Sequence, residues 1–333
     1  MRAAFYRRTG PAAEVLELGD LPDPVPGPGE VLVRLRASGI NPSDTKRRGG
    51  WRGMAMQHPL VVPHSDGAGE IVALGAGVTA ERLGEAVWVF EAQGGYGTAG
   101  RASGTAAELV ALPSPNALPL PAGFDFAAGA CLGVPAMTAH RAVMSDGPVA
   151  GQTVLVQGAA GAVGHFAVQI AVAGGARVIA TVSSPEGAAH ARAAGAEVTV
   201  DRHREGVAAR VLELTGGAGV ERVIEVDFGA NQAIDIAVLK RNGTIASYSS
   251  STMPEAPLPY YDFAFKGATL RFVQGFAMPD AARDLAQRAI ADLAARGRLT
   301  AAVALRLTLG RIAEAHAAVE RGGLLGNVVV EIG

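Results

Sequence analysis

The residues whose types and spacing best suggest chemistry form a glycine-rich turn near the middle of the chain. Residues 154–164 read VLVQGAAGAVG, a short apolar run followed by glycines three positions apart. A helix that begins at such a turn presents unpaired backbone N–H groups and the positive end of its dipole, which suits a phosphate. The spacing resembles the Gly-x-Gly-x-x-Gly dinucleotide fingerprint, with Ala159 at the first glycine. We expect Gly161 to let the backbone approach a pyrophosphate and Gly164 to let the helix pack closely.

The end of the next predicted strand indicates which dinucleotide the turn would take. NAD sites usually place Asp or Glu there, about 20 residues after the turn, to bind the ribose hydroxyl. This chain has Ser183 and Ser184 at that place and Arg202 after the following strand. Serine hydroxyls donate to a 2′-phosphate and arginine pairs with one bidentately, so the pattern predicts NADPH. A plain turn for the serines and a solvated charge for Arg202 are the alternative readings.

Several other chemistries lack their residues. The sequence contains no Tyr-x-x-x-Lys pair, no Gly-x-Ser-x-Gly elbow and no His-x-x-x-His spacing. The single cysteine, Cys131, forms neither an internal disulfide nor a structural zinc cluster, which predicts a reducing, cytoplasmic location. The 29 Lys and Arg against 31 Asp and Glu leave no basic footprint, so we expect no nucleic-acid partner. No apolar run is long enough to predict a membrane span.

The elements that must position the turn fall into two parts. Residues 1 to about 120 look β-rich, and residues 30–40 alternate apolar and polar side chains as a half-buried strand does. From Gln152 onward, short apolar strands alternate with helices, which implies a parallel sheet with helices on both faces. Within this part we expect a helix over 231–243, an edge strand over 269–276 and a long amphipathic helix over 279–299.

Five runs together resemble one known family. They are ASGINPSD (37–44), PHSDGAGEIVALGAGV (63–78), GVPAMTAHRAV (133–143), VLVQGAAGAVGHFAVQIA (154–171) and GNVVVEIG (326–333). The chain resembles, over essentially its whole length, the zinc-free quinone oxidoreductase (ζ-crystallin-like) branch of the medium-chain dehydrogenases/reductases. The resemblance implies an α/β fold: a GroES-like β-rich catalytic domain (1–122 and 276–333) plus a Rossmann doubly wound parallel-sheet domain that binds NADP (123–275).

The resemblance also implies that the metal site is lost. In zinc-binding relatives a ligand cysteine occupies the position of Asn41 and a ligand histidine that of Ser65. Asn41 and Ser65 cannot provide the thiolate and imidazole that zinc needs, so we expect no metal. His64 stands one residue away, where this branch more often has glycine. We expect His64 to be packed or hydrogen-bonded, because a strand neighbour of Ser65 would point to the opposite face.

The site residues follow from the resemblance, position by position. As catalytic residues it implies Asn41, facing the nicotinamide or the substrate, and Thr138, hydrogen-bonding the nicotinamide nucleotide. As cofactor-binding residues it implies Gly158, Ala160, Gly161, Ala162, Val163, Gly164, Ser183, Ser184, Arg202, Val226, Ser247, Tyr248 and Asn327. Tyr96 or water is the candidate proton donor.

The expected activity is NADPH-dependent hydride transfer to a quinone without zinc. The partner would then be a small electrophile. An enoyl or alkenal reductase, and a non-catalytic NADPH-binding protein, stay open as alternatives. A third alternative, RNA binding, is disfavoured by the charge balance. We also expect a homodimer, paired through the edge strand over 269–276.

Overall fold

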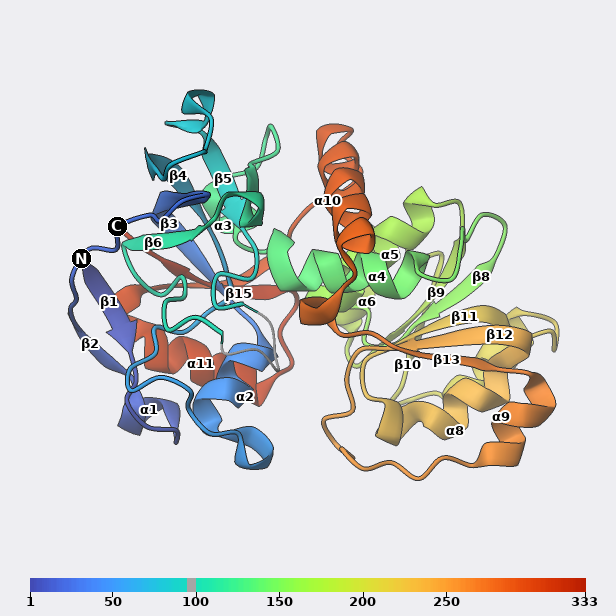
Figure 1. The fold of residues 1–333 in the computed structure, drawn as a ribbon. Helices are drawn as coiled ribbons and strands as arrows, with labels where there is room; N and C mark the ends of the chain where they lie inside the picture. The colour runs from blue at the N-terminus through green and yellow to red at the C-terminus, as the bar shows by residue number, and fades with distance from the viewer. Residues whose placement is uncertain (95–99) are drawn as a thin grey trace. The chain divides into compact units, whose positions relative to one another are not determined.

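The computed structural model describes residues 1–94 and 100–333, and these form two compact units. The first unit contains residues 1–135 and 300–333, and the second contains residues 136–299. Figure 1 shows the elements of each unit. No helix among the described residues is long and apolar enough to cross a membrane.

The first unit is built on a seven-stranded sheet in the order β14-β15-β3-β4-β5-β7, with β6 paired to β3. Its long central strand is β3, whose buried and more exposed side chains alternate over most of its length, as the sequence predicts. The strands are β3 (Glu30–Ile40), β4 (Asp66–Leu74), β5 (Ala86–Val89), β6 (Leu109–Pro113), β7 (Ala117–Pro119), β14 (Val303–Thr308) and β15 (Asn327–Glu331). The remaining strands and α-helices are β1 (Arg2–Phe5), β2 (Glu17–Asp20), α1 (Ala12–Val15), α2 (Pro42–Gly49), α3 (Phe126–Gly129) and α11 (Ile312–Arg321).

The second unit is a six-stranded parallel sheet with helices on both faces, as the alternating pattern predicts (Figure 1). The strands are β8 (Thr153–Val156), β9 (Arg177–Val182), β10 (Val198–Asp201), β11 (Val220–Glu225), β12 (Leu239–Ser247) and β13 (Thr269–Phe272). The helices are α4 (Met137–Met144), α5 (Ala162–Ala173), α6 (Pro185–Ala193), α7 (Val207–Leu214), α8 (Phe228–Val238), α9 (Tyr260–Lys266) and α10 (Asp280–Ala295).

The strand order of this sheet determines where a ligand is expected. The order is β10-β9-β8-β11-β12-β13, so the chain moves outward from β8 in one direction and then from β11 in the other. In open parallel sheets, ligands bind beyond the carboxyl ends of the strands at the point where the order reverses. That point lies between β8 and β11.

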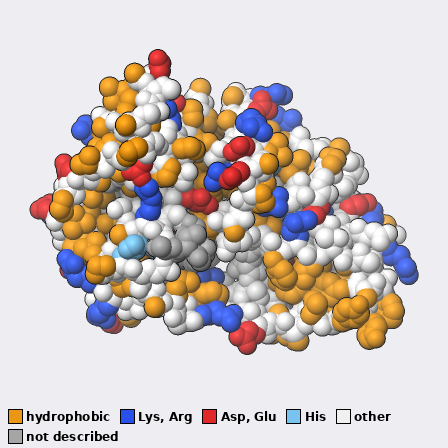
Figure 2. Space-filling model, viewed as in Figure 1, with side chains coloured by type: hydrophobic (Ala, Val, Ile, Leu, Met, Phe, Trp, Pro, Cys, Tyr) orange, Lys and Arg blue, Asp and Glu red, His pale blue; other side chains and the backbone are white. Residues whose placement is uncertain are grey.

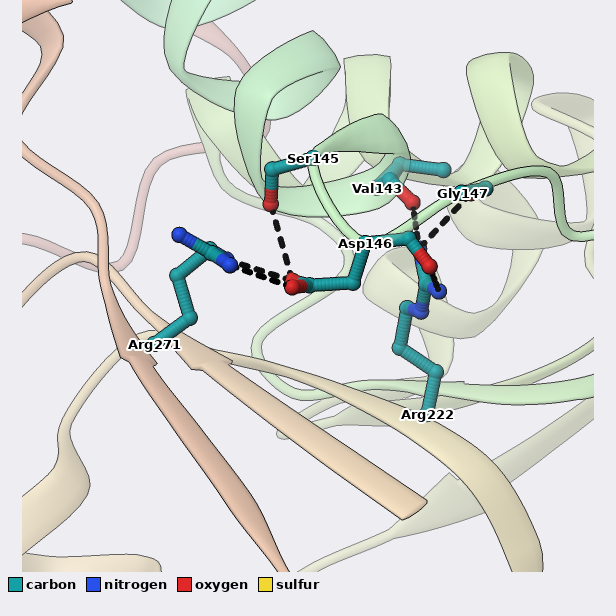
Figure 3. Close-up of polar contacts among 6 residues, drawn as sticks. All are labelled: Val143, Ser145, Asp146, Gly147, Arg222 and Arg271. Carbon is teal, nitrogen blue, oxygen red and sulfur yellow. Dashed lines mark hydrogen bonds and ion pairs between the residues drawn. The ribbon is translucent and has the colours of Figure 1, made fainter. Parts of the chain in front are cut away.

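Two arginines on the sheet hold the C-terminal turn of α4 (Figure 3). From β11, Arg222 donates to the carbonyl oxygens of Val143, Asp146 (3.0 Å) and Gly147 (3.3 Å). From β13, Arg271 pairs with both oxygens of the Asp146 carboxylate. Carbonyls at a helix C-terminus have no intrahelical donor, so the Arg222 cation satisfies them and interacts favourably with the helix dipole. The contacts attach α4 to the sheet.

One predicted helix is wrong at its end. The expected helix over 231–243 stops at Val238, and β12 begins at Leu239 with extended backbone (φ −68°, ψ 132°). The register of β11 against β12 shifts between Val220 and Arg222, and Asn242 takes a positive φ of 61°. The strand therefore starts with an irregular stretch. Leu239 and Lys240 follow the apolar spacing of the helix in sequence, but they belong to the strand.

The unit boundaries differ from the predicted domain limits of 122/123 and 275/276. Helix α3 packs against β3, β4 and β5, which keeps residues up to 135 with the first unit. Helix α10 packs against α4, which keeps residues up to 299 with the second. Pro-rich composition indicated the first limit, whereas side-chain packing determines where each unit ends.

Candidate active site

The glycine-rich turn connects β8 to α5 at the switch point of the sheet. Gly158 takes a left-handed conformation (φ 64°), which favours glycine because other residues are strained there. Gly161 is the N-cap of α5, and the His165 N–H donates to its carbonyl in the first intrahelical bond. The helix geometry leaves the N–H groups of residues 162–164 without an intrahelical acceptor, so they are available to an anion.

Space around the two later glycines distinguishes their roles. A Cβ at Gly164 would lie 2.4 Å from the Gly158 carbonyl oxygen and 2.8 Å from Ala159 Cα, so only glycine permits this close packing. A Cβ at Gly161 would meet only the Gly158 oxygen, at 3.5 Å. The expected packing role of Gly164 is confirmed. The open side at Gly161 and the free N–H groups of the helix fit a pyrophosphate.

The predicted cofactor residues of the second unit lie along the edge of its sheet formed by the carboxyl ends of the parallel strands. Ser183, Arg202 and Val226 each follow the carboxyl end of a different parallel strand, and Ser247 is the last residue of β12. Val226 packs over the turn, since its Cγ1 would be 3.0 Å from a Cβ at Gly158. The candidates that this unit brings to the edge are Gly158, Ala160, Gly161, Ala162, Val163, Gly164, Ser183, Ser184, Arg202, Val226, Ser247 and Tyr248.

A carboxylate that the sequence reading missed borders this edge. Ser184 is the N-cap of α6, and its Oγ accepts the Gly187 N–H at 3.0 Å. Glu186 lies in the first turn of α6, and its pKa is lowered by its own backbone N–H and by the Ser184 hydroxyl. Glu186 therefore adds a carboxylate beside Ser184 that the residues at the strand end do not indicate. Arg202 is exposed, and its N–H donates to Val182 at the end of β9.

Thr138 and Asn327 lie in different units. Thr138 is the second residue of α4 and is 6% exposed, and its Oγ1 would lie 2.8 Å from a Cβ at Gly275. Asn327 begins β15 in the first unit, and its Nδ2 donates to the Ala302 carbonyl at 3.1 Å. This bond gives Asn327 a structural role, and its part in cofactor binding stays a prediction. Tyr96 lies outside the described residues.

In the first unit, Asn41 is the centre of a buried polar cluster. Its N–H donates to Asp44 Oδ2 at 2.8 Å, and its Nδ2 donates to Asp66 Oδ2 at 2.7 Å. The Val134 N–H donates to the same Asp66 oxygen at 2.7 Å. Ser65 Oγ donates more weakly to Asp44 Oδ1, at 3.4 Å. Asn41 thus caps α2 and ties it to the start of β4.

Burial changes the protonation of both carboxyl groups in this cluster. Burial raises the pKa of Asp44 to about 6, against hydrogen bonds that lower it. Burial and the charge of Asp44 raise the pKa of Asp66 well above its usual range. Among the described residues, Asp66 Oδ1 has no hydrogen-bond partner, and it would lie 2.1 Å from a Cβ at Gly133. Asp66 therefore favours its protonated form, and a Cβ at residue 133 would force the Asp66 side chain to move.

The donor set at Asn41 does not fit zinc. The Asn41 side chain donates an amide hydrogen to Asp66, and Ser65 has only a hydroxyl group. Neither position therefore provides the thiolate or the imidazole that zinc needs. Across residues 1–94 and 100–333, no three His, Cys, Asp or Glu side chains are arranged to hold a metal ion.

His64 is packed and hydrogen-bonded, as expected, but for a different reason. It lies outside any strand and takes a positive φ of 77°, so the argument from strand alternation is wrong. Its Nδ1 lies 2.7 Å from Ser38 Oγ, and its Nε2 lies 2.8 Å from His316 Nε2. Burial lowers the pKa of both histidines, that of His316 to about 3, so both are neutral. The positive φ explains why glycine is expected at this position.

The comparisons with known proteins agree with this architecture. Residues 27–122 match the alcohol dehydrogenase GroES-like domain, and residues 162–295 match the zinc-binding dehydrogenase family. The chain is 40% identical to a quinone oxidoreductase of Pseudomonas aeruginosa, over 65% of this chain and 63% of that protein. It is 32% identical to the quinone oxidoreductase of Homo sapiens, over 70% of this chain and 68% of that protein.

The solved structures that resemble this chain over its whole length include the following two. One is described as an NAD-dependent alcohol dehydrogenase (30% identity, 100% of each chain, TM-score 0.89). The other is a mycobacterial protein solved in complex with NADPH (29% identity, 100% of each chain, TM-score 0.86). With its GroES-like and doubly wound units and these relatives, the chain belongs to the medium-chain dehydrogenase/reductase family of oxidoreductases.

Proposed function

We propose that this chain transfers hydride from NADPH to a quinone without a zinc ion. The observation that carries the proposal is the dinucleotide turn, open at Gly161, in a chain whose Asn41 and Ser65 replace the metal-binding side chains. The relatives named quinone oxidoreductase support the acceptor, and the NADPH complex of the mycobacterial relative supports the cofactor.

The residues at the sheet edge divide the cofactor between them. The N–H groups of residues 162–164 take the pyrophosphate, while Arg202 and the serine hydroxyls take the 2′-phosphate. When bound, NADPH supplies the hydride. Thr138 and the backbone around Ser247 and Tyr248 orient the nicotinamide side in this proposal.

The substrate class follows from the absence of a Lewis acid in the proposal. A quinone is already electrophilic, and its developing charge is delocalised onto an oxygen that hydrogen bonds stabilise. The Asn41 amide has two hydrogens, and Asp66 accepts only one of them. In this proposal the second hydrogen is donated to the acceptor oxygen, and the proton comes from water or Tyr96. The single cysteine still favours a reducing, cytoplasmic location.

The test is loss of NADPH absorbance with benzoquinone or phenanthrenequinone, run beside NADH and beside an alkenal. Turnover of quinone with NADPH, and little with NADH, supports the proposal. Turnover of the alkenal alone assigns the chain to ene-reduction, and tight NADPH binding without any turnover assigns it to a binding role. Zinc at one equivalent per chain in the purified protein would refute the zinc-free mechanism.

We also infer a homodimer formed through the edge of the second unit. β13 ends the sheet, and Tyr260, Tyr261, Phe265 and Phe272 are 67%, 68%, 72% and 71% exposed. Figure 2 shows hydrophobic side chains gathered over this part of the unit. Exposed edges and apolar patches of this kind are usually covered by another chain. Light scattering should give a dimer for the wild type and for Leu285→Lys on α10, and a monomer for Phe272→Lys.

A further inference from the structure

A chain of buried hydrogen bonds runs beneath the glycine-rich turn. The Gly158 N–H donates to Thr181 Oγ1 (3.0 Å), and the Thr181 hydroxyl donates to Gln157 Oε1 (2.8 Å). Gln157 Nε2 then donates to Asp235 Oδ1 (3.0 Å). The side chains of Gln157, Thr181 and Asp235 are 4%, 1% and 0% exposed. This series of hydrogen bonds therefore links the turn, β9 and α8 at the switch point of the sheet.

The direction of these bonds depends on Asp235. The Gln157 amide has a donor end and an acceptor end, and Asp235 Oδ1 accepts from the donor end. The acceptor end then faces Thr181, so the Thr181 hydroxyl must donate to it and keep its lone pairs for the Gly158 N–H. Without an acceptor at residue 235, Gln157 is free to rotate and the Thr181 hydroxyl to reorient.

Asp235 lies within hydrogen-bonding reach of a second buried acid, Glu225 at the end of β11. Glu225 Oε1 accepts from Asn231 Nδ2 (3.0 Å) and from the Asp227 N–H. One oxygen remains on each acid, Asp235 Oδ2 and Glu225 Oε2, and neither has a partner among the described residues. A single proton between these two oxygens satisfies both, whereas two ionised carboxylates would repel each other.

The surroundings favour this shared proton. The groups that face the pair are Gln157 after β8, Asn231 from α8, Asp227 after β11 and Tyr248 after β12. None of these four side chains is a cation. Burial raises the pKa of both acids, and the charge of Glu225 raises that of Asp235 further, well above its usual range. Glu225 accepts two N–H hydrogen bonds and Asp235 accepts one, so Glu225 is the better stabilised anion and the proton belongs on Asp235.

We propose that Asp235 is a neutral carboxylic acid that donates to Glu225 and thereby positions the Gly158 turn for the cofactor. Both acids are positioning residues, because they act on the cofactor through Gln157 and Thr181. The proposal rests on the role of the turn in binding the dinucleotide. In it, the buried acid pair determines which groups donate and which accept in the hydrogen bonds beneath the turn.

Substitution of Asp235 separates this role from simple core packing. Asp235→Asn keeps an acceptor for Gln157 and an N–H donor for Glu225, so we expect the NADPH dissociation constant to stay within about twofold of wild type. Asp235→Leu fills similar space without either bond, and we expect about tenfold weaker binding. Asp284→Asn, the same change on the exposed surface of α10, is the matched control.

The dependence of binding on pH provides the decisive readout. At alkaline pH the wild type loses the shared proton, the two carboxylates repel, and NADPH binding weakens. Asp235→Asn cannot ionise, so its affinity should stay constant over the same range. Fluorescence titration of NADPH measures both. An equal alkaline loss in wild type and Asp235→Asn, or a Leu variant that melts earlier but binds normally, would overturn the proposal.

Infrared spectroscopy tests the proton without any cofactor. The wild type should show the C=O stretch of a protonated carboxyl group that Asp235→Asn removes and Asp284→Asn keeps. Carbon-13 labelling of aspartate carboxyls should shift that band, and an unshifted band would place the proton on Glu225 and refute the assignment. If wild type binds neither NADPH nor NADH, the proposed function fails, and this spectrum still decides the state of the acid pair.

Discussion

Three glycine-to-alanine changes around the turn separate folding from cofactor binding. Gly164→Ala places a methyl group 2.4 Å from the Gly158 oxygen and 2.8 Å from Ala159 Cα, both backbone atoms that cannot rotate away. Gly161→Ala places one where the nearest atom is 3.5 Å away. Gly187→Ala on α6 is the control, since its methyl would meet Ala160 Cβ at an ordinary 3.4 Å.

The three substitutions should change the free energy of unfolding differently. Helix propensity favours Gly164→Ala by about 1 kcal/mol, but forcing two backbone segments apart costs about 1–3 kcal/mol, so we expect a net loss of stability. Gly161 has φ −77°, which alanine adopts freely. The gain of about 0.4–1 kcal/mol in chain entropy is offset by the poorer N-cap, which leaves its stability near wild type. Gly187→Ala should be neutral or slightly more stable.

Thermal unfolding and NADPH titration read out the two effects. Gly161→Ala should melt like wild type and bind NADPH at least tenfold more weakly, about 1.4 kcal/mol, because its methyl group occupies the approach to the turn. Gly164→Ala should lose both stability and affinity. If Gly161→Ala folds normally and binds NADPH as wild type does, the pyrophosphate does not lie on this turn, and the assignment of the cofactor site is wrong.

Three further substitutions test other parts of the site. Glu186→Gln removes the carboxylate beside Ser184 and should lower the NADPH dissociation constant severalfold while leaving that for NADH unchanged, by paired titration. Each buried neutral histidine lowers stability as the pH drops below 6.5, because only the unfolded chain binds its proton, whereas the raised pKa values of Asp44 and Asp66 act in the opposite sense. His64→Gly should therefore reduce the slope of stability against pH by about 1.4 kcal/mol per pH unit relative to wild type, measured by denaturant titration across the pH range. Gly133→Ala should disturb Asp66, costing about 1–3 kcal/mol in the same assay, and reduce quinone turnover.

Local patterns in the sequence were sufficient for the parallel sheet and the turn. The apolar runs before Gly158 and the glycine spacing are short-range signals, and β8, α5 and Gly164 follow them directly. The limit of α8 was not predictable in this way, because its apolar spacing continues into β12. The dinucleotide fingerprint concerns only the residues at the end of the strand. Glu186 lies beyond them, in the first turn of the next helix, so the pattern did not indicate its carboxylate.

Contacts between distant segments left no pattern to detect. Gln157 and Asp235 are 78 residues apart, and His64 and His316 are 252 apart. Each residue alone is an ordinary polar side chain in an apolar stretch. Only the sheet order, which places β8 beside β11, brings Gln157 to α8. The buried polar groups that position a site are therefore the part that sequence reasoning predicts least.

The two buried acid pairs, Asp44 with Asp66 and Glu225 with Asp235, share one property: each brings two carboxyl groups together away from water. A buried pair of ionised carboxyl groups is costly unless a cation or a proton neutralises one of them. At the first pair, Asn41 and Ser65 offer only an amide and a hydroxyl, so no metal-binding thiolate or imidazole is present at those positions. Burial and the charge of Asp44 raise the pKa of Asp66, so a proton on Asp66 neutralises this pair, as the proton on Asp235 does at the other.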